Sequence, residues 1–340
     1  MSSSPEQPKV GLDPLVGQLR AAGEETRLRL LALIAEGELN VTDLTDILGQ
    51  SQPRISRHLK LMAEAGLIER NREGAWAFFR IAERHPAGAL ARALVERLDP
   101  RDGIIAADRA RLQAVRAARA EAAKAYFDKH AAEWDRIRSL HASDEAVEAA
   151  ILDMVGPGPF RAVLDLGTGT GRILSLLASR ASRLVGVDAN HAMLAVARAN
   201  LERAGLRQAE LRQGDIYALP VERNAFDLVI IHQVLHFLDD PARALREAAS
   251  VLAPGGRLLV VDFAPHGLEF LREAHAHRRL GFERDQMVAW LNEAGVHTTR
   301  HLQLPAPDGS PDQLTVSLWL GRDRRIAVAG GGAEGQQEVA

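Results

Sequence analysis

A glycine-rich segment, Asp165–Gly171, joins a strand-like apolar run to a helix-forming run. It reads DLGTGTG, and it follows Ala162–Leu164 directly. Glycines at such a junction let the backbone turn sharply and let a ligand approach without interference from Cβ atoms. Because several nucleotide-binding folds share this pattern, the motif alone does not identify the ligand. It predicts a ligand site at the carboxyl end of a buried strand.

Short apolar runs alternate with helical patterns around and after this segment. The strand-like runs are Ala162–Asp165, Leu184–Val187, Leu211, Phe226–Ile231, Leu258–Phe263 and Gln313–Leu320. The helical runs between them are Arg172–Ser179, Ala192–Ala204 and Ala242–Leu252. This alternation predicts an α/β domain with a parallel sheet covered on both faces.

Carboxylates follow the second and third predicted strands. Asp188 ends the run VGVD, where an acidic side chain can bind both hydroxyls of a ribose. Asp215 and Ile216 follow the third strand in QGDI and suit a contact with an adenine amino group. The segment VLAPGG, at 251–256, precedes the fifth strand.

This ordered set resembles class I S-adenosylmethionine (SAM)-dependent methyltransferases, especially the group similar to enzymes of ubiquinone and menaquinone biosynthesis. The resemblance covers about Tyr126 to Leu320 and implies a Rossmann-like fold. By this resemblance Asp165 and the backbone of Gly167–Gly169 hold the amino acid end of SAM, and Asp188 binds its ribose. The same resemblance implies that Met193 packs on adenine and that Asp215 and Ile216 contact the edge of its ring.

The resemblance implies a SAM site that extends beyond these residues. Tyr126 and Trp134 look like the segment that caps SAM, although they could equally pack the preceding helix on the domain. The predicted cofactor-binding residues are Tyr126, Trp134, Asp165, Gly167, Thr168, Gly169, Asp188, Ala189, Met193, Asp215, Ile216 and His232. A nicotinamide cofactor is disfavoured by Asp165 at the start of the glycine loop and by the Asp215 segment.

No catalytic residue stands out, and the candidate we name is His232. His232 and His236 are four residues apart, but Gln233 replaces the glutamate of the zinc-protease motif and no third ligand is evident. We therefore predict no metal site, with His232 lining the SAM pocket and His236 on a helix surface. His266, His275 and His277 could form a base or metal cluster, but we expect them to be exposed.

The first part of the chain has the order of a winged helix-turn-helix. Helical apolar spacing begins at Leu12, a short helix ends at Gly49, and a second helix runs from the N-cap Ser51 to about Ala65. Two strand-like runs then flank the polar turn Asn71–Gly74. This order predicts a DNA-binding domain.

The DNA-binding charge must be local, because the net charge is −3. Between Ser51 and Arg72 five basic residues face two acidic ones. The predicted DNA-binding residues are Ser51, Gln52, Arg54, Ser56, Arg57, His58, Lys60, Arg70 and Arg72. Gln52, Arg54, Ser56 and Arg57 lie near the start of the predicted helix, the part of a recognition helix that contacts base edges. Arg70 and Arg72 could reach phosphate or the minor groove.

The stretch Leu12 to Ile81 resembles the ArsR-type family of dimeric bacterial repressors. The resemblance rests on ELNVTDL, at 38–44, and SRHLKLM, at 56–62. Metal-sensing members have cysteines where this chain has Asn40 and Thr42. Since the chain contains no cysteine, arsenite sensing through that site, disulfides and zinc-thiolate sites are excluded.

These patterns predict five segments. They are a disordered stretch 1–10, a winged-helix domain 11–98, a helical linker or dimerisation segment 99–140, a SAM-binding domain 141–322 and a disordered tail 323–340. The linker follows from an Ala-, Arg- and Glu-rich composition that favours a long helix. Without a signal peptide or an apolar span, we expect a cytoplasmic protein.

Two functions remain open. The chain is either a transcriptional regulator, most simply a repressor, with SAM or S-adenosylhomocysteine as effector, or an active methyltransferase acting on a small molecule, with an autoregulatory or dimerising winged helix. In the first case we expect a homodimer on a double-stranded DNA operator, because a two-fold protein reads paired half-sites. In the second, a small-molecule methyl acceptor is the further partner.

Overall fold

The computed structural model describes residues 9–73, 76–82, 85–131, 144–206, 209–305 and 314–325. The chain forms two compact units. The first comprises Met1–His130 together with two later segments, Leu235–Pro241 and Phe263–Phe282. The second comprises Ala131–Val234, Ala242–Asp262 and Glu283–Ala340.

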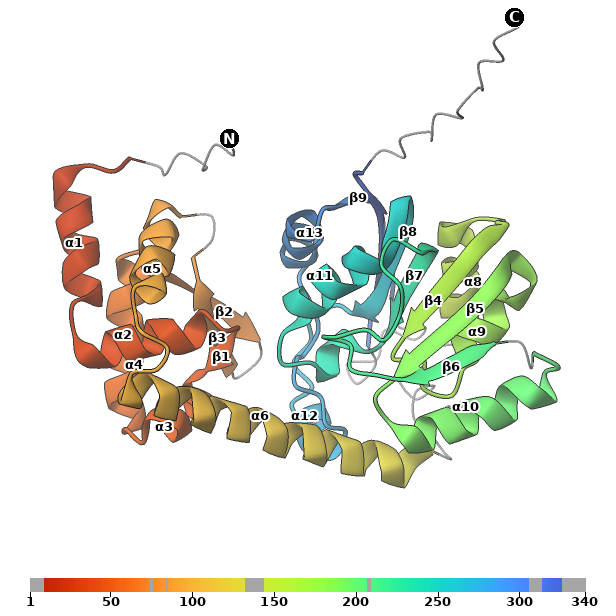
Figure 1. The fold of residues 1–340 in the computed structure, drawn as a ribbon, viewed down its shortest axis with the longest axis horizontal. Coiled ribbons are helices and arrows are strands. Elements are labelled where there is room, and N and C mark those ends of the chain that lie inside the picture. The colour runs from red at the N-terminus through yellow and green to blue at the C-terminus, as the bar shows by residue number, and fades with distance from the viewer. Residues whose placement is uncertain are drawn as a thin grey trace, which may run out of the picture. The chain divides into compact units, whose positions relative to one another are not determined.

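The first unit is mostly helical with a small antiparallel sheet (Figure 1). Its elements are α1 (Leu12–Ala22), α2 (Glu25–Ile34), β1 (Leu39–Asn40), α3 (Val41–Leu48), α4 (Gln52–Glu64), β2 (Ile68–Glu73), β3 (Trp76–Ile81), α5 (Pro86–Glu96), α6 (Gly103–His130), η3 (Leu235–Phe237) and α12 (Phe270–Ala274).

Helices α3 and α4 form the predicted helix-turn-helix. Asn40 caps α3 through a reciprocal pair of bonds with Asp43, and Gly49 ends the helix in the left-handed conformation at φ 63°. Helix α4 then begins after Ser51, with a proline in its first turn. It buries Ile55, Leu59 and Met62, one residue per turn, in the core of the unit.

The ribbon that follows is antiparallel, with strand order β1-β3-β2. Register pairs Ile68 with Ile81 and Arg70 with Phe79. Phe78 of β3 is fully buried. The winged helix-turn-helix predicted from the sequence is confirmed.

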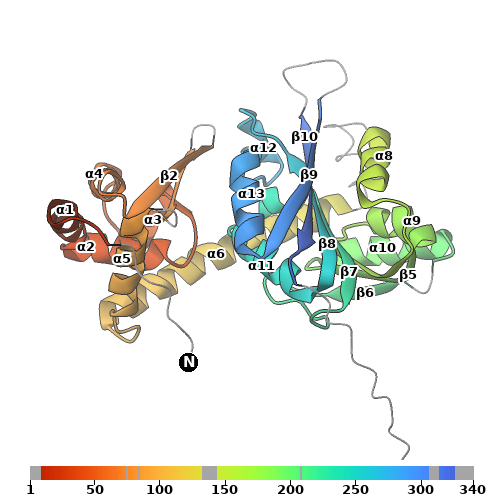
Figure 2. The ribbon, with the colours of Figure 1, turned by 90° about the horizontal axis from the view of Figure 1, so that it is seen from above.

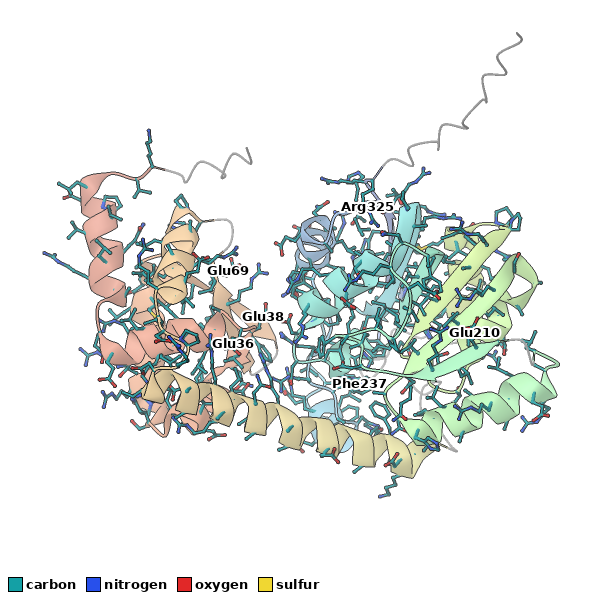
Figure 3. All side chains as sticks on the ribbon, in the orientation of Figure 1. Glu36, Glu38, Glu69, Glu210, Phe237 and Arg325 are labelled. Carbon is teal, nitrogen blue, oxygen red and sulfur yellow. The ribbon has the colours of Figure 1, made fainter. Side chains whose placement is uncertain are left out.

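Helix α6 is attached to this domain by charged contacts. Arg29 of α2 bonds to Asp108 through two nitrogens, at 2.7 and 2.9 Å. Arg109 Nε lies 2.6 Å from Glu36 Oε1, and Arg116 donates to the Glu36 carbonyl at 2.9 Å. Glu36, after the end of α2, is labelled in Figure 3.

The segment Phe263–Phe282 forms a loop whose two ends are joined. Phe282 N–H donates to the Phe263 carbonyl at 2.9 Å, and His266 N–H donates to the Leu280 carbonyl at 3.0 Å. Gly281 makes this closure possible at φ 88°, because a Cβ there would lie 2.1 Å from the Ala264 carbonyl oxygen. The two ends of the loop therefore lie side by side, next to Phe263.

The second unit is an α/β layer structure. Its elements are α8 (Asp144–Val155), β4 (Phe160–Leu166), α9 (Arg172–Leu177), η2 (Ala178–Arg180), β5 (Ala181–Asp188), α10 (His191–Arg203), β6 (Glu210–Gln213), β7 (Phe226–His232), α11 (Pro241–Val251), β8 (Leu252–Phe263), α13 (Arg284–Glu293), β9 (Val296–Leu304) and β10 (Val316–Asp323). The first residue of α11, Pro241, and the last residue of β8, Phe263, are counted with the first unit.

Seven strands form one sheet in the order β6-β5-β4-β7-β8-β10-β9. Figure 1 labels these strands except β10, which is labelled in Figure 2. The pairs among β6, β5, β4, β7 and β8 are parallel, and β9 pairs with β10 antiparallel. Strands β4, β7 and β8 are almost wholly buried, as expected for a covered parallel sheet. The predicted fold class, a winged helix-turn-helix followed by a Rossmann-like domain, is confirmed. The sequence prediction lacked β9.

Among the described residues, no helix is long and apolar enough to cross a membrane.

Candidate functional site

The glycine loop lies at the carboxyl end of β4. Gly167, Gly169 and Gly171 have φ values of 70°, 53° and 81°, which glycine adopts without strain. The backbone N–H groups of Gly167 and Thr168 donate to the Val187 carbonyl of β5, at 2.8 and 3.0 Å. The loop is thereby fixed to the end of the neighbouring strand.

Two glycines make room for this packing. A Cβ at Gly167 would lie 2.4 Å from Val234 Cγ2, and one at Gly186 would lie 2.8 Å from Thr168 Oγ1. Real Cβ atoms do not approach other atoms so closely, so a side chain at either position would force Val234 or Thr168 to shift. Gly186, in the middle of VGVD, had no assigned role in the sequence interpretation.

Asp188 ends β5 beside this loop. Its Oδ2 accepts the Gly169 N–H at 2.8 Å, and its Oδ1 accepts the Asn190 N–H at 2.8 Å. Burial raises the pKa of the Asp188 carboxyl, while the two backbone N–H groups act in the opposite direction. A carboxylate held at both oxygens is pre-oriented, and each oxygen can still accept a further hydrogen bond.

Asp165 and Thr168 form a buried pair inside the loop. Thr168 Oγ1 donates to Asp165 Oδ2 at 2.6 Å, and the two residues are 6% and 1% exposed, respectively. This bond spans the turn and sets its shape. Asp165, Asp188 and the predicted candidate His232 come from three adjacent parallel strand ends, and thus lie along one edge of the sheet.

The start of α10 follows Asp188. Asn190 caps the helix by accepting the Met193 N–H at 2.9 Å, and Met193 is 2% exposed. Ala189 is exposed, and its carbonyl accepts Gln213 Nε2 at 3.1 Å. The backbone around the predicted adenine contact is therefore well defined.

Asp215 and Ile216 form a turn next to Asp188. Gly214 N–H donates to the Asp188 carbonyl at 3.0 Å, which places the turn at this strand end. Asp215 is exposed and accepts the Tyr217 N–H at 2.9 Å, and Ile216 is half-buried. Their contact with an adenine stays a prediction.

His232 is the last residue of β7, half-buried and in register with Val261 of β8. Gln233, next along the chain, has φ 54° and donates its N–H to the Val261 carbonyl at 2.7 Å. A non-glycine residue in this conformation is uncommon and is often found at functional sites. Within the described residues, no group of three potential ligands could hold a metal ion.

His236, His266, His275 and His277 belong to the first unit and are less exposed than expected. His236 and His277 are 2% and 6% exposed, and their ring centroids lie 4.2 Å apart. His266 and His275 are half-buried. The expected surface positions were wrong because the aromatic side chains Phe237 and Phe263 pack around these rings.

Tyr126 also lies in the first unit, in α6. Its hydroxyl is 2.9 Å from His275 Nδ1, and burial raises the pKa of Tyr126 and lowers that of His275. Trp134 lies outside the described residues. A cap on SAM by these two residues therefore stays a prediction.

Most of the predicted DNA-binding residues on α4 are exposed. This exposed group comprises Ser51, Gln52, Arg54, Arg57 and Lys60. Ser56 is half-buried, Arg70 on β2 is exposed, and the side chain of Arg72 lies outside the described ones.

The side chain of His58 is not part of this exposed group and lies against the start of α2. Its Nδ1 lies 3.7 Å from Glu24 Oε2, its side chain is only 13% exposed, and desolvation lowers its pKa. Glu24 is the N-cap of α2. His58 therefore packs α4 on α2, and its contact with DNA stays a prediction.

Two family models match the chain. The model described as bacterial regulatory protein, arsR family, matches residues 24–70, and the methyltransferase domain model matches residues 164–260. The predicted pairing of these two domains is confirmed.

Curated relatives named as methyltransferases are similar to part of the chain. An uncharacterized methyltransferase of Mycobacterium tuberculosis is 40% identical over 167 residues, which cover 49% of this chain and 56% of that protein. A demethylmenaquinone methyltransferase of Clavibacter sepedonicus is 28% identical over 198 residues, covering 58% and 79%. The chain spans between a third and just over half of the length of the first relatives, at 33% and 56%.

Part of the chain also resembles solved structures. The N-methyltransferase NodS of Bradyrhizobium japonicum, solved with S-adenosyl-L-homocysteine, is 20% identical, with a TM-score of 0.40 over 49% of this chain and 79% of NodS.

Proposed function

This chain joins a regulatory domain of the arsR family to a methyltransferase domain, and we propose that it is a transcriptional repressor with SAM or S-adenosylhomocysteine as its effector. In this proposal the second unit binds the effector at the carboxyl edge of its sheet. The first unit binds a double-stranded DNA operator through α4.

The observation that carries the proposal is the arrangement of Asp188. Its two oxygens are held by the backbone N–H groups of Gly169 and Asn190, so the carboxylate is positioned before a ligand arrives. A fixed carboxylate suits the two hydroxyl donors of a ribose, which SAM and S-adenosylhomocysteine share. Pre-positioned polar groups strengthen binding because less order is lost on association.

The glycine loop fits the rest of such a ligand. Its close packing, which a Cβ at Gly167 or Gly186 would break, brings backbone rather than side chains to the edge of the sheet. The chain's own residues would bind and orient the ligand there: Asp188 the ribose, Met193 and Ile216 the adenine, and the loop the amino acid end. SAM, when bound, supplies an electrophilic methyl group on its sulfonium.

The DNA-binding role is supported by the exposed residues of α4. Arg54 and Arg57 can contact bases or phosphates, and Gln52 has an amide that can pair with adenine. We propose a homodimer, since two copies of α4 would then read paired half-sites. An effector changes DNA affinity only if it binds the two states of the protein unequally.

The alternative is an active methyltransferase acting on a small molecule. The relatives named demethylmenaquinone methyltransferase favour it. Methyl transfer from a sulfonium requires mainly alignment of the acceptor, so a site without an obvious base is compatible with catalysis. In that case the winged helix autoregulates its operon or dimerises the chain.

A titration separates the two functions. A duplex selected by the protein from a random-sequence pool is labelled, and its dissociation constant is measured without ligand, with SAM and with S-adenosylhomocysteine. A change with either compound, of about fivefold or more, supports the repressor. Tight DNA binding that ignores both compounds contradicts the effector role and directs attention to methyl acceptors.

A further inference from the structure

Two adjacent arginines in the loop Phe263–Phe282 have no part in the function proposed above. Arg279 is fully buried in the first unit. Its Nη1 donates to Glu38 Oε2 at 2.8 Å, and its Nη2 donates to the Asp239 carbonyl at 3.3 Å. Its guanidinium carbon lies 4.0 Å from the centroid of the Phe78 ring. Figure 3 labels Glu38, which comes immediately before β1.

Arg278 bonds to the start of α3. Its Nη2 lies 3.4 Å from Asp43 Oδ2, and its Nε pairs with the Asp239 carboxylate. Asp43 is fully buried, and the same Oδ2 accepts the Asn40 N–H in the cap of α3 at 3.4 Å. Arg278 therefore contacts the group that fixes the first turn of the helix-turn-helix.

Burying these charged groups contributes little to the free energy of folding, but it constrains where the loop Phe263–Phe282 lies. A guanidinium taken out of water loses its hydration, and its ion pair regains that free energy only in good geometry. Arg279 has such a geometry, with a carboxylate, a carbonyl and an aromatic face. These contacts hold the loop against Glu38, just before β1, and against Phe78 of β3.

The chain connects these arginines to the glycine loop. The N–H groups of Arg278 and Arg279 donate to the carbonyl of His236, at 2.8 and 3.0 Å. His236 lies two residues after Val234, whose methyl group would be 2.4 Å from a Cβ at Gly167. Each contact lies within one unit, and the covalent bond between Val234 and Leu235 connects the two.

We propose that Arg278 and Arg279, here named the arginine latch, transmit the occupancy of the glycine loop to α3 and α4. The proposal rests on the effector function above and assigns its regulation. A ligand that displaces Gly167 displaces Val234, and with it the His236 carbonyl that holds the latch. Engagement of Glu38 and Asp43 then differs between the two ligand states, and α3 carries the difference to α4, against which it packs.

The test compares two latch variants with wild type. Arg278→Gln removes one charge at the rim of the buried cluster. The double variant Glu38→Gln with Arg279→Met removes both partners of the buried pair, so neither charge is left uncompensated. Arg300→Gln is the matched control, because Arg300 forms an exposed pair with Asp153 in the second unit.

Three quantities are measured on the full chain: the DNA dissociation constant with and without SAM or S-adenosylhomocysteine, the calorimetric affinity for both compounds, and amide exchange in α3. We expect wild type and control to change DNA affinity about fivefold or more with ligand. Both latch variants should still bind the compounds, and their DNA affinity should no longer respond. Amide exchange in α3 should be faster in both variants.

The outcomes separate the latch from the effector function. Latch variants that respond to ligand as fully as the control overturn the latch and leave the effector function standing. If wild type binds neither compound, the effector function fails, and amide exchange alone decides whether the latch holds α3. If amide exchange in α3 is as slow in the latch variants as in Arg300→Gln, the latch does not stabilise α3 either.

Discussion

The Gly169 N–H donates to Asp188 Oδ2 at 2.8 Å, across 19 residues of sequence. This bond joins the glycine loop after β4 to the end of β5. Gly169 has a left-handed conformation at φ 53°, and its N–H bond joins the loop and the acidic residue. A change at either residue should therefore affect the whole proposed nucleoside site.

Asp188→Asn should weaken the binding of SAM. The amide nitrogen cannot accept from Gly169 or Asn190, and a neutral side chain binds ribose hydroxyls less strongly than a carboxylate. Loss of one such charge-assisted bond costs about 1.5–3 kcal/mol, which corresponds to roughly a 10- to 150-fold increase in the dissociation constant. Calorimetry with SAM measures this increase.

Asp153→Asn is the matched control, because Asp153 forms an exposed surface pair with Arg300. Its affinity for SAM should equal that of wild type. Equal affinities for Asp188→Asn and Asp153→Asn would contradict the ribose role of Asp188.

Binding of SAM should weaken on acidification at a higher pH than an ordinary aspartate would give. Burial raises the pKa of Asp188. The carboxylate form accepts the ribose hydroxyls, so affinity for SAM is full above the raised pKa and is lost as pH falls through it.

The effect of the same raised pKa on the stability of the folded chain has the opposite sign. The folded state holds this proton more tightly, so Asp188 lowers stability as pH rises from its ordinary value of about 3.9 to the raised one.

Calorimetric titrations with SAM across a pH series test this dependence. The Asp188→Asn variant should bind weakly at every pH, without the acid loss. The same acid loss in that variant would assign the titration to another group.

The sequence predicted the sheet strands and loop at the ligand edge because they are marked by local patterns. Buried parallel strands read as apolar runs, and a sharp turn beside them needs glycine. Strand β9 has no such mark, since its residues 297–300 are His, Thr, Thr and Arg at the edge of the sheet. It is ordered by pairing with β10 and by packing against α13, and neither contact is marked by a pattern within the strand itself.

The buried position of Arg279 was also beyond sequence reasoning. Its partner Glu38 is 241 residues away, and arginines are rarely fully buried unless paired. Without knowledge of the fold, the residues around Arg279 in the sequence therefore predict an exposed side chain. The same argument explains why His236 and His277 were expected at the surface.

Arg54→Ala and Arg57→Ala should weaken DNA binding while leaving SAM binding unchanged. Both side chains are exposed on α4 in the first unit, whereas the predicted SAM residues Asp165 and Asp188 lie in the second. Loss of a base contact costs about 1–3 kcal/mol, and loss of a phosphate contact lowers the salt slope by about one. Fluorescence anisotropy at several salt concentrations separates these two roles.

Arg223→Ala serves as control, because Arg223 is exposed in the second unit and pairs with Glu247. DNA affinity and salt slope should match wild type. If Arg54→Ala and Arg57→Ala match it too, α4 does not contact DNA.

Glu210→Gln should lower the free energy of unfolding only where Glu210 is ionised. Arg183 Nε at 2.8 Å and Arg212 Nη2 at 2.7 Å hold the pKa of Glu210 at about 2, below its ordinary 4.5 (Figure 3). A depressed pKa gives stability that is present above the ordinary value and lost as pH falls from 4.5 toward 2. Because the side chain is 39% exposed, we expect at most about 1 kcal/mol.

Urea unfolding of wild type and variant, from about neutral pH down to about pH 3, measures this contribution. The difference in unfolding free energy should be constant near neutrality and shrink below about 4.5. Glu222→Gln is the control, since Glu222 pairs with the same Arg183 at 3.2 Å but is 65% exposed. It should cost less than Glu210→Gln. A difference that stays the same at all pH values would show that Glu210 acts through packing and not through its charge.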